Sequence, residues 1–163
     1  MDQNKVTICW PNRVDQANLS GGSWSSSLPL SNLQDRVFAK KARSTSTSSA
    51  HTKCIVALDK PRAVAAIALA AHNFSASATV RVRAYDDYAQ ATLLYDSGAV
   101  LAWPSFYQLE QYEWEDNSYW LGDQTLDVTS DYTPLATIFF TDILVVRSLL
   151  IEISDASNPA GYI

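Results

Sequence analysis

The sequence predicts an all-β protein, built as a β-sandwich or jelly roll. Short apolar segments recur at intervals of about ten residues with turn residues between them, and no long segment has a convincing helical period. The chain of 163 residues, 47% of them hydrophobic, is long enough to bury a substantial core. We therefore expect a single β-sandwich domain over residues 1–163.

The N-terminal part should contribute one strand and a long loop. Residues 5–10 (KVTICW) form the expected strand, which ends at Pro11-Asn12. Residues 15–35 carry a Gly-Gly pair, a serine run and a proline, which favours a loop over a linker between domains. The loop should pack against the body of the protein through its apolar residues, which are Leu19, Trp24, Leu28, Leu30 and Leu33.

The remaining strands follow from period-two alternation and β-branched residues. They are expected at residues 52–58, 63–71, 79–85, 91–95, 100–103, 136–140 and 148–153, with turns at 59–61, 72–77 and 86–90. Residues 141–147 fit either a strand or a short turn of helix, and the polar run 44–49 (STSTSS) fits an extended edge.

The alanine-rich stretch 67–87 poses the question of whether it is a helix that presents a catalytic histidine. Helix propensity favours that view, but TVRVRAY alternates with period two, so we expect a strand, a turn at His72-Asn73 and a second strand. In such a turn, asparagine tolerates left-handed geometry and an imidazole can satisfy main-chain groups. We interpret His72 as structural, because no motif supplies a partner nucleophile.

Composition narrows the class of partner. The net charge of -5 argues against nucleic acid, and the basic segment 36–43 (RVFAKKAR) is typical of a solvated surface. No secretory signal and no apolar run long enough to cross a membrane are visible. Cys9 and Cys54 both lie in apolar strand patterns, which suits buried thiols made in the cytosol, with a disulfide between them as the alternative.

The common signatures of enzymes and of metal sites are absent from the sequence. There is no Gly-rich phosphate loop, no G-x-S-x-G, no HExxH and no CxxC, so we predict a protein that is not an enzyme and has no cofactor or metal. Acidic residues that could pair across a cleft are better interpreted as a solvated loop; they are Glu110, Glu113, Glu115, Asp116 and Asp123. Asp123, Asp127 and Asp131 lack the spacing of a calcium-binding EF-hand loop.

An aromatic segment at residues 103–120 is the strongest candidate for binding. Rings with polar handles provide large contact areas at low entropic cost, on a sugar face or on a protein partner. Three interpretations stay open: the rings close one end of the sandwich, form a protein interface in an assembly, or form a carbohydrate platform. The candidate binding residues are Trp103, Tyr107, Tyr112, Trp114, Tyr119 and Trp120.

Several motifs resemble a family of tail proteins from tailed bacteriophages and prophages. The likeness runs from about residue 32 to residue 163, with a gap over the aromatic segment. It is clearest in Ala71-His72-Asn73-Phe74-Ser75, in Tyr95-Asp96-Ser97-Gly98 and in residues 155–163. The resemblance implies a discoidin-like, galactose-binding-like jelly roll. Members of that family commonly continue past residue 163, so the chain could form the N-terminal part of a longer tail protein.

The resemblance implies a non-enzymatic structural component of a phage tail, at or near the distal tip. Such a protein docks to other tail proteins of the tube, hub or fibre and is expected to form a homo-oligomer within the virion. The alternative is a carbohydrate-binding module that helps the particle adhere to a host surface glycan.

Overall fold

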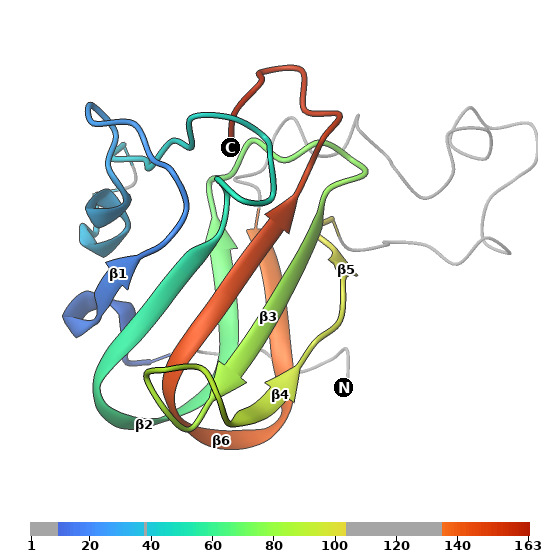
Figure 1. The fold of residues 1–163 in the computed structure, drawn as a ribbon. Helices are drawn as coiled ribbons and strands as arrows, with labels where there is room; N and C mark the ends of the chain where they lie inside the picture. Colours follow the sequence, from blue (N-terminus) through green and yellow to red (C-terminus); the bar gives the residue numbers. More distant parts are fainter. Residues whose placement is uncertain (1–9, 38, 104–134) are drawn as a thin grey trace, which may run out of the picture.

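The structure, a computed structural model, describes residues 10–37, 39–103 and 135–163 (Figure 1). Two short 3-10 helices, η1 (Val14–Gln16) and η2 (Leu30–Gln34), lie in the N-terminal part. The strands are β1 (Asn18–Ser20), β2 (Cys54–Ala70), β3 (Thr79–Tyr85), β4 (Leu93–Asp96), β5 (Val100–Leu101) and β6 (Leu135–Ser154). The predicted all-β fold is confirmed.

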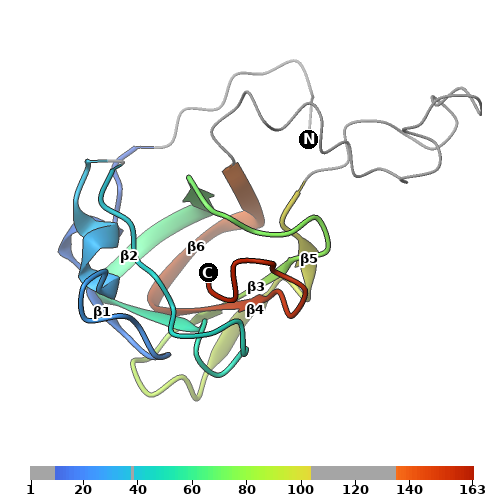
Figure 2. The same ribbon diagram turned by 90° about the horizontal axis from the view of Figure 1, so that it is seen from above.

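All six strands belong to one antiparallel sheet with the order β1-β2-β6-β3-β4, and β5 pairs with β3. The two long strands, β2 and β6, bend together at the lower end of Figure 1 and return behind the front layer. Figure 2, which looks down from the upper end, shows the two halves of each long strand in different layers. The sheet thus folds back on itself as a sandwich.

The bend replaces a turn that the sequence predicts at residues 59–61. β2 continues through these residues, and its register with β6 shifts between the pairs Ala57–Ser148 and Arg62–Val146. The prediction of two separate strands was wrong because β6 pairs with both halves of β2, so the extra residues form a bulge instead of ending the strand. In the same way, residues 141–147 belong to one continuous β6, which selects the strand alternative.

The core lies between the two layers and follows the alternation of the strands. In β3, Val80, Val82 and Ala84 are at most 2% exposed, while Arg81 points outward. Residues of both halves of β6 join them, including Phe140, Val146 and Leu149. Period two in the sequence therefore identified the buried face of β3 correctly.

The long loop at residues 15–35 packs against the sandwich, as predicted, although it also contains regular structure. β1 pairs with β2, so that Leu19 lies opposite Val56. Leu30 is buried, whereas Leu33 is 45% exposed and does not join the core. The Gln34 side chain donates from Nε2 to the carbonyls of Val14 (2.9 Å) and Ala17 (2.6 Å), which ties η2 to η1.

The single described cysteine, Cys54, is a free buried thiol, and burial raises its pKa to about 12. A thiol in this state is chemically inert at neutral pH. Cys9 lies outside the described residues, as do residues 5–9 of the first predicted strand. Within the described ranges, no helix is long and apolar enough to span a membrane.

Candidate functional site

A pocket of about 300 Å³ is lined by residues from the N-terminal part of the described chain and from the bulged part of β2. Three segments that are distant in sequence form it: the stretch from Trp10 to η1, Arg36 after η2, and the bulged part of β2. Its lining residues are Trp10, Pro11, Asn12, Arg13, Asp15, Gln16, Arg36, Asp59 and Arg62.

A local turn fixes one wall of the pocket. The Asn12 side chain accepts a hydrogen bond from the Val14 amide (3.2 Å) through Oδ1 and donates to Asp15 Oδ1 (2.7 Å) through Nδ2. Asparagine commonly starts such turns because its side chain can substitute for a main-chain partner. The turn leads into η1 and places Arg13, Asp15 and Gln16 around the pocket.

Two arginines of the pocket are neutralised by carboxylates. Arg36 pairs with Asp15 at 2.7 Å. Arg62 forms a two-point contact with Asp59, with Nε donating to Oδ1 at 2.9 Å and Nη2 donating to Oδ2 at 2.6 Å. The hydrogen bond from Arg62 lowers the pKa of Asp59. A carboxyl with a lowered pKa is a poor general acid, which argues against glycosidase chemistry at this residue.

An exposed tryptophan stands at the rim. Trp10 is 77% exposed, a large fraction for the residue type that usually buries the most apolar area. The same pocket is lined by residues with amide, guanidinium and carboxylate groups, which can donate to or accept from hydroxyls. A flat apolar face beside hydrogen-bonding groups is the combination that a sugar ring, with its apolar and hydroxylated sides, requires.

Trp103, the first of the predicted binding residues, lies at the opposite end of the sandwich. It is partly buried, and its indole N–H donates to the carbonyls of Phe74 (3.2 Å) and Ser75 (3.1 Å). Its ring meets His72 edge-on, with 5.0 Å between the ring centroids. These contacts anchor the turn between β2 and β3. The function predicted for Trp103 stays a prediction.

His72 occupies the predicted turn and contacts main chain, as expected. Its Nδ1 accepts from the Phe74 amide (3.3 Å), and its ring stacks on Phe74 at 4.0 Å between centroids. Nε2 is buried and has no hydrogen-bond partner among the residues that the structure describes. Burial lowers the pKa of His72 to about 4, against the opposing attraction of Asp155. The left-handed residue of the turn is Ala71 (φ 57°), where Asn73 was the expected one.

The C-terminal segment holds this turn in place. The Asp155 side chain is 2% exposed and accepts from the Ser75 amide (2.8 Å), the Ser75 hydroxyl and Asn158 Nδ2 (2.9 Å). Asn73 Nδ2 donates to the Tyr162 carbonyl at 3.0 Å. Two of the motifs that carry the tail-protein resemblance, residues 71–75 and 155–163, therefore meet and stabilise one end of the fold.

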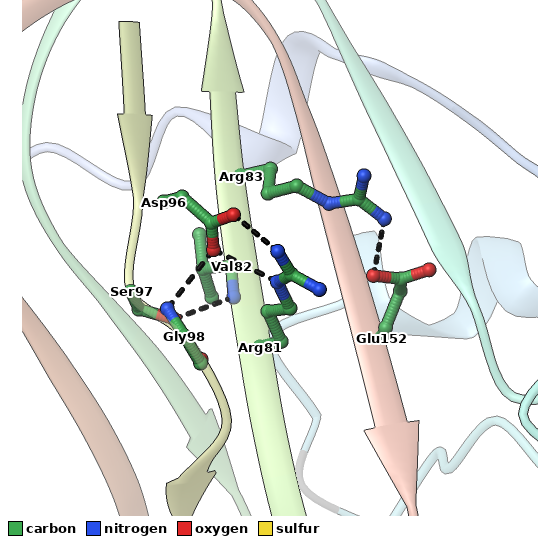
Figure 3. A network of polar contacts seen from close by, with 7 residues as sticks. All are labelled: Arg81, Val82, Arg83, Asp96, Ser97, Gly98 and Glu152. Atoms are coloured by element: carbon green, nitrogen blue, oxygen red, sulfur yellow. Dashed lines mark hydrogen bonds and ion pairs between the residues drawn. The ribbon is translucent and has the colours of Figure 1, made fainter. Parts of the chain in front are cut away.

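The third motif, Tyr95-Asp96-Ser97-Gly98, belongs to a network on the outer face of the front layer (Figure 3). Arg81 binds Asp96 through two hydrogen bonds, and hydrogen bonding to Arg81 lowers the pKa of Asp96 to about 2. Arg83 pairs with Glu152 of β6 at 2.5 Å. Each charged group of the network is paired with another, and the pairs link β3 to β4 and to β6.

The other predicted binding residues lie outside the described residues, namely Tyr107, Tyr112, Trp114, Tyr119 and Trp120. The same holds for the acidic residues between 110 and 131. Within the described part of the chain, no three His, Cys, Asp or Glu side chains gather as metal ligands would.

Sequence reasoning missed the pocket. Its one local signal was a tryptophan followed by the Pro-Asn turn pair, but Trp10 was assigned to a strand. Arg36 and Arg62 are 26 residues apart in the chain and reach the pocket only through the tertiary fold.

Comparison with known proteins supports the fold. No protein-family model and no curated protein matches the chain. Among solved structures, the family 32 carbohydrate-binding module of C. perfringens NanJ, in complex with galactose, is similar with a TM-score of 0.56 and 15% identity over 92% of this chain and 89% of that one. The corresponding module of AlyQ, in complex with 4,5-unsaturated mannuronic acid, gives a TM-score of 0.52 with 16% identity over 89% and 86% of the two chains.

A truncated AlyQ that also contains an alginate lyase domain matches with a TM-score of 0.52 and 15% identity; the match covers 89% of this chain but 29% of that protein. At these identities the likeness establishes the fold, a galactose-binding-like β-sandwich, and no more. The fold that the tail-protein resemblance implied is thereby confirmed.

Proposed function

We propose that the chain is a non-catalytic carbohydrate-binding module and that the pocket beside Trp10 is its ligand site. The exposed ring of Trp10 at the rim of a hydrogen-bonding pocket is the observation that carries this proposal. The fold is shared with modules whose structures hold galactose or a mannuronic acid derivative, which supports a binding role by analogy. A host surface glycan is the expected ligand class.

The test is titration of the protein with host-type surface polysaccharides while tryptophan fluorescence is monitored. We expect the fluorescence to change on binding and the Trp10→Ala variant to lose both the change and the affinity. Trp114→Ala is the comparison, because Trp114 belongs to the aromatic segment that the sequence predicted as a sugar platform. Loss of binding in Trp114→Ala with full binding in Trp10→Ala would move the site away from the pocket.

A second candidate function is the structural role in a phage tail, near its distal tip. Besides the resemblance, a row of exposed apolar residues on β6 favours docking to another subunit: Leu135 (51%), Phe139 (37%), Ile143 (71%) and Val145 (56%). The proposed partners are other tail proteins, including copies of this chain, and the proposed location is the virion.

Immunogold electron microscopy tests the tail role. Antibody raised against this domain should label the tail tip of intact particles. Absence of label on both intact and gently disrupted particles would contradict a virion location. Replacing Trp114 and Trp120 by alanine should lower tail assembly while the isolated domain stays folded, and an unchanged infectious titre would count against an interface there.

A further inference from the structure

The charges of the pocket beside Trp10 do not balance. Among the described residues, three guanidinium groups line it, but only two carboxylates do. Arg36 is paired with Asp15, and Arg62 is paired with Asp59. The third, Arg13, has no hydrogen bond or ion pair from its side chain to any described residue. The pocket therefore carries one surplus positive charge in a protein whose net charge is -5.

The two carboxylates of the pocket are paired with arginines other than Arg13. Asp15 receives a hydrogen bond from Asn12 at 2.7 Å in addition to its pair with Arg36, so both of its oxygens are occupied. Both oxygens of Asp59 accept from Arg62 in the same way. Among the described residues neither carboxylate contacts Arg13, and so this guanidinium is available to a ligand.

We propose that the ligand of this pocket is an acidic sugar whose carboxylate is bound by Arg13, an inference that rests on the proposed carbohydrate-binding function. A planar guanidinium matches a carboxylate with two parallel hydrogen bonds, a geometry that neutral hydroxyls do not reproduce. Trp10, which lines the same pocket as Arg13, receives the apolar face of the same sugar on its ring. Together these groups select a hexuronic acid over a neutral hexose.

The pocket provides the remaining contacts from groups that are not fully used. Gln16 contributes its amide, which makes a single 3.4 Å contact with Arg62 through Oε1 and leaves its Nε2 without a partner among the described residues. That amide can donate to a ring hydroxyl or to the carboxylate. In this arrangement Arg13 determines the preference for acid, while Trp10 determines affinity for the sugar ring itself.

Isothermal titration of the intact chain tests this assignment. The probes are a galacturonate oligosaccharide and a mannuronate oligosaccharide, each compared with its methyl ester and with the neutral galactan or mannan of the same length. The methyl ester keeps the ring and removes the charge. We expect the acid to bind at least about tenfold more tightly than the ester, the lower end of what a hydrogen bond to a charged group contributes.

The Arg13→Gln variant should lose this preference and bind acid and ester alike. Arg43→Gln is the matched control, because it removes the same charge from a residue that lies over the Tyr162 ring, outside the pocket. It should keep the wild-type preference. Added salt should weaken binding of the acid and leave binding of the neutral oligosaccharide unchanged.

The possible failures are distinguishable. If acid, ester and neutral sugars bind equally and Arg13→Gln changes none of them, the acidic-sugar assignment is overturned while the carbohydrate-binding function stands. Tighter binding of a sulfated galactan than of either uronate would also overturn it, because the pocket would then prefer a sulfate to a carboxylate. If the folded protein binds none of the probes or host polysaccharides, both proposals fail.

Discussion

The stability of the domain should fall as the pH is lowered from 6.5 to 4, and His72 should cause a measurable part of the fall. Above about pH 4 the imidazole of His72 stays neutral in the folded protein, because its Nδ1 accepts from the Phe74 amide and partial burial lowers its pKa. In the unfolded chain the ring takes up a proton near its usual pKa of 6.5, whereas in the fold its pKa is about 4. Acid therefore favours the unfolded state over this whole interval.

The magnitude follows from the two pKa values. Their difference corresponds to a limit of about 3 kcal/mol in the free energy of unfolding. Because the ring retains partial contact with solvent, we expect about half of that limit, ~1.5 kcal/mol, to be realised. The protonated ring would also have to give up the bond from the Phe74 amide, which adds to the cost in the same direction.

Denaturant unfolding at pH 6.5 and pH 4 measures the effect, compared between the wild type and the His72→Gln variant. Glutamine keeps an acceptor for the Phe74 amide but does not titrate, so the variant should lose less stability between the two pH values. His51→Gln controls for the loss of a histidine at an exposed position and should behave as the wild type. An identical pH dependence in wild type and His72→Gln would refute the reasoning.

Three further changes test the fold. Gly22→Ala should destabilise the protein by about 2 kcal/mol or more, since φ is +67° and a Cβ would lie within 2.5 Å of two main-chain carbonyl oxygens. Gly98→Ala is the control: its φ is +64° but a Cβ there meets open space, so it should cost only about 1 kcal/mol. Thermal unfolding of the two variants measures the difference. Leu149→Ala, at 2% exposure, should cost about 2–4 kcal/mol in denaturant unfolding. Asp96→Asn should cost about 0.5–1 kcal/mol near neutral pH. In the fold, Arg81 lowers the pKa of Asp96 from 3.8 to about 2, so the cost of the substitution should disappear as the pH falls from 3.8 to about 2. A cost that persists at the lowest pH would contradict this.

Local pattern was sufficient for the strands that alternate regularly. Thr79–Tyr85 has the bounds that the sequence predicts, because Val80, Val82 and Ala84 alternate with polar residues and every second side chain must reach the core. The turn at His72 was predictable for the same reason, since strand patterns flank it on both sides. The expected contact of its imidazole with main chain is confirmed by the hydrogen bond that the Phe74 amide donates to Nδ1.

Local pattern was insufficient where strands bend. Asp59-Lys60-Pro61 has the composition of a turn, and in isolation it would end a strand. In the fold, β6 pairs with the residues on both sides, so the segment becomes a bulge in one long strand. Long-range pairing decides between these outcomes, and no window of a few residues contains that information.

By itself, the sequence determined the all-β class, the buried face of its regular strands and the turn at His72, because these depend on period and neighbours along the chain. Only the tertiary structure decided that Trp10, Arg13, Arg36 and Arg62 line one pocket. A binding site of this kind depends on which side chains meet in space and on which charges are already paired. Both follow from the packing of segments that are distant in sequence, and neither is encoded in any one of them.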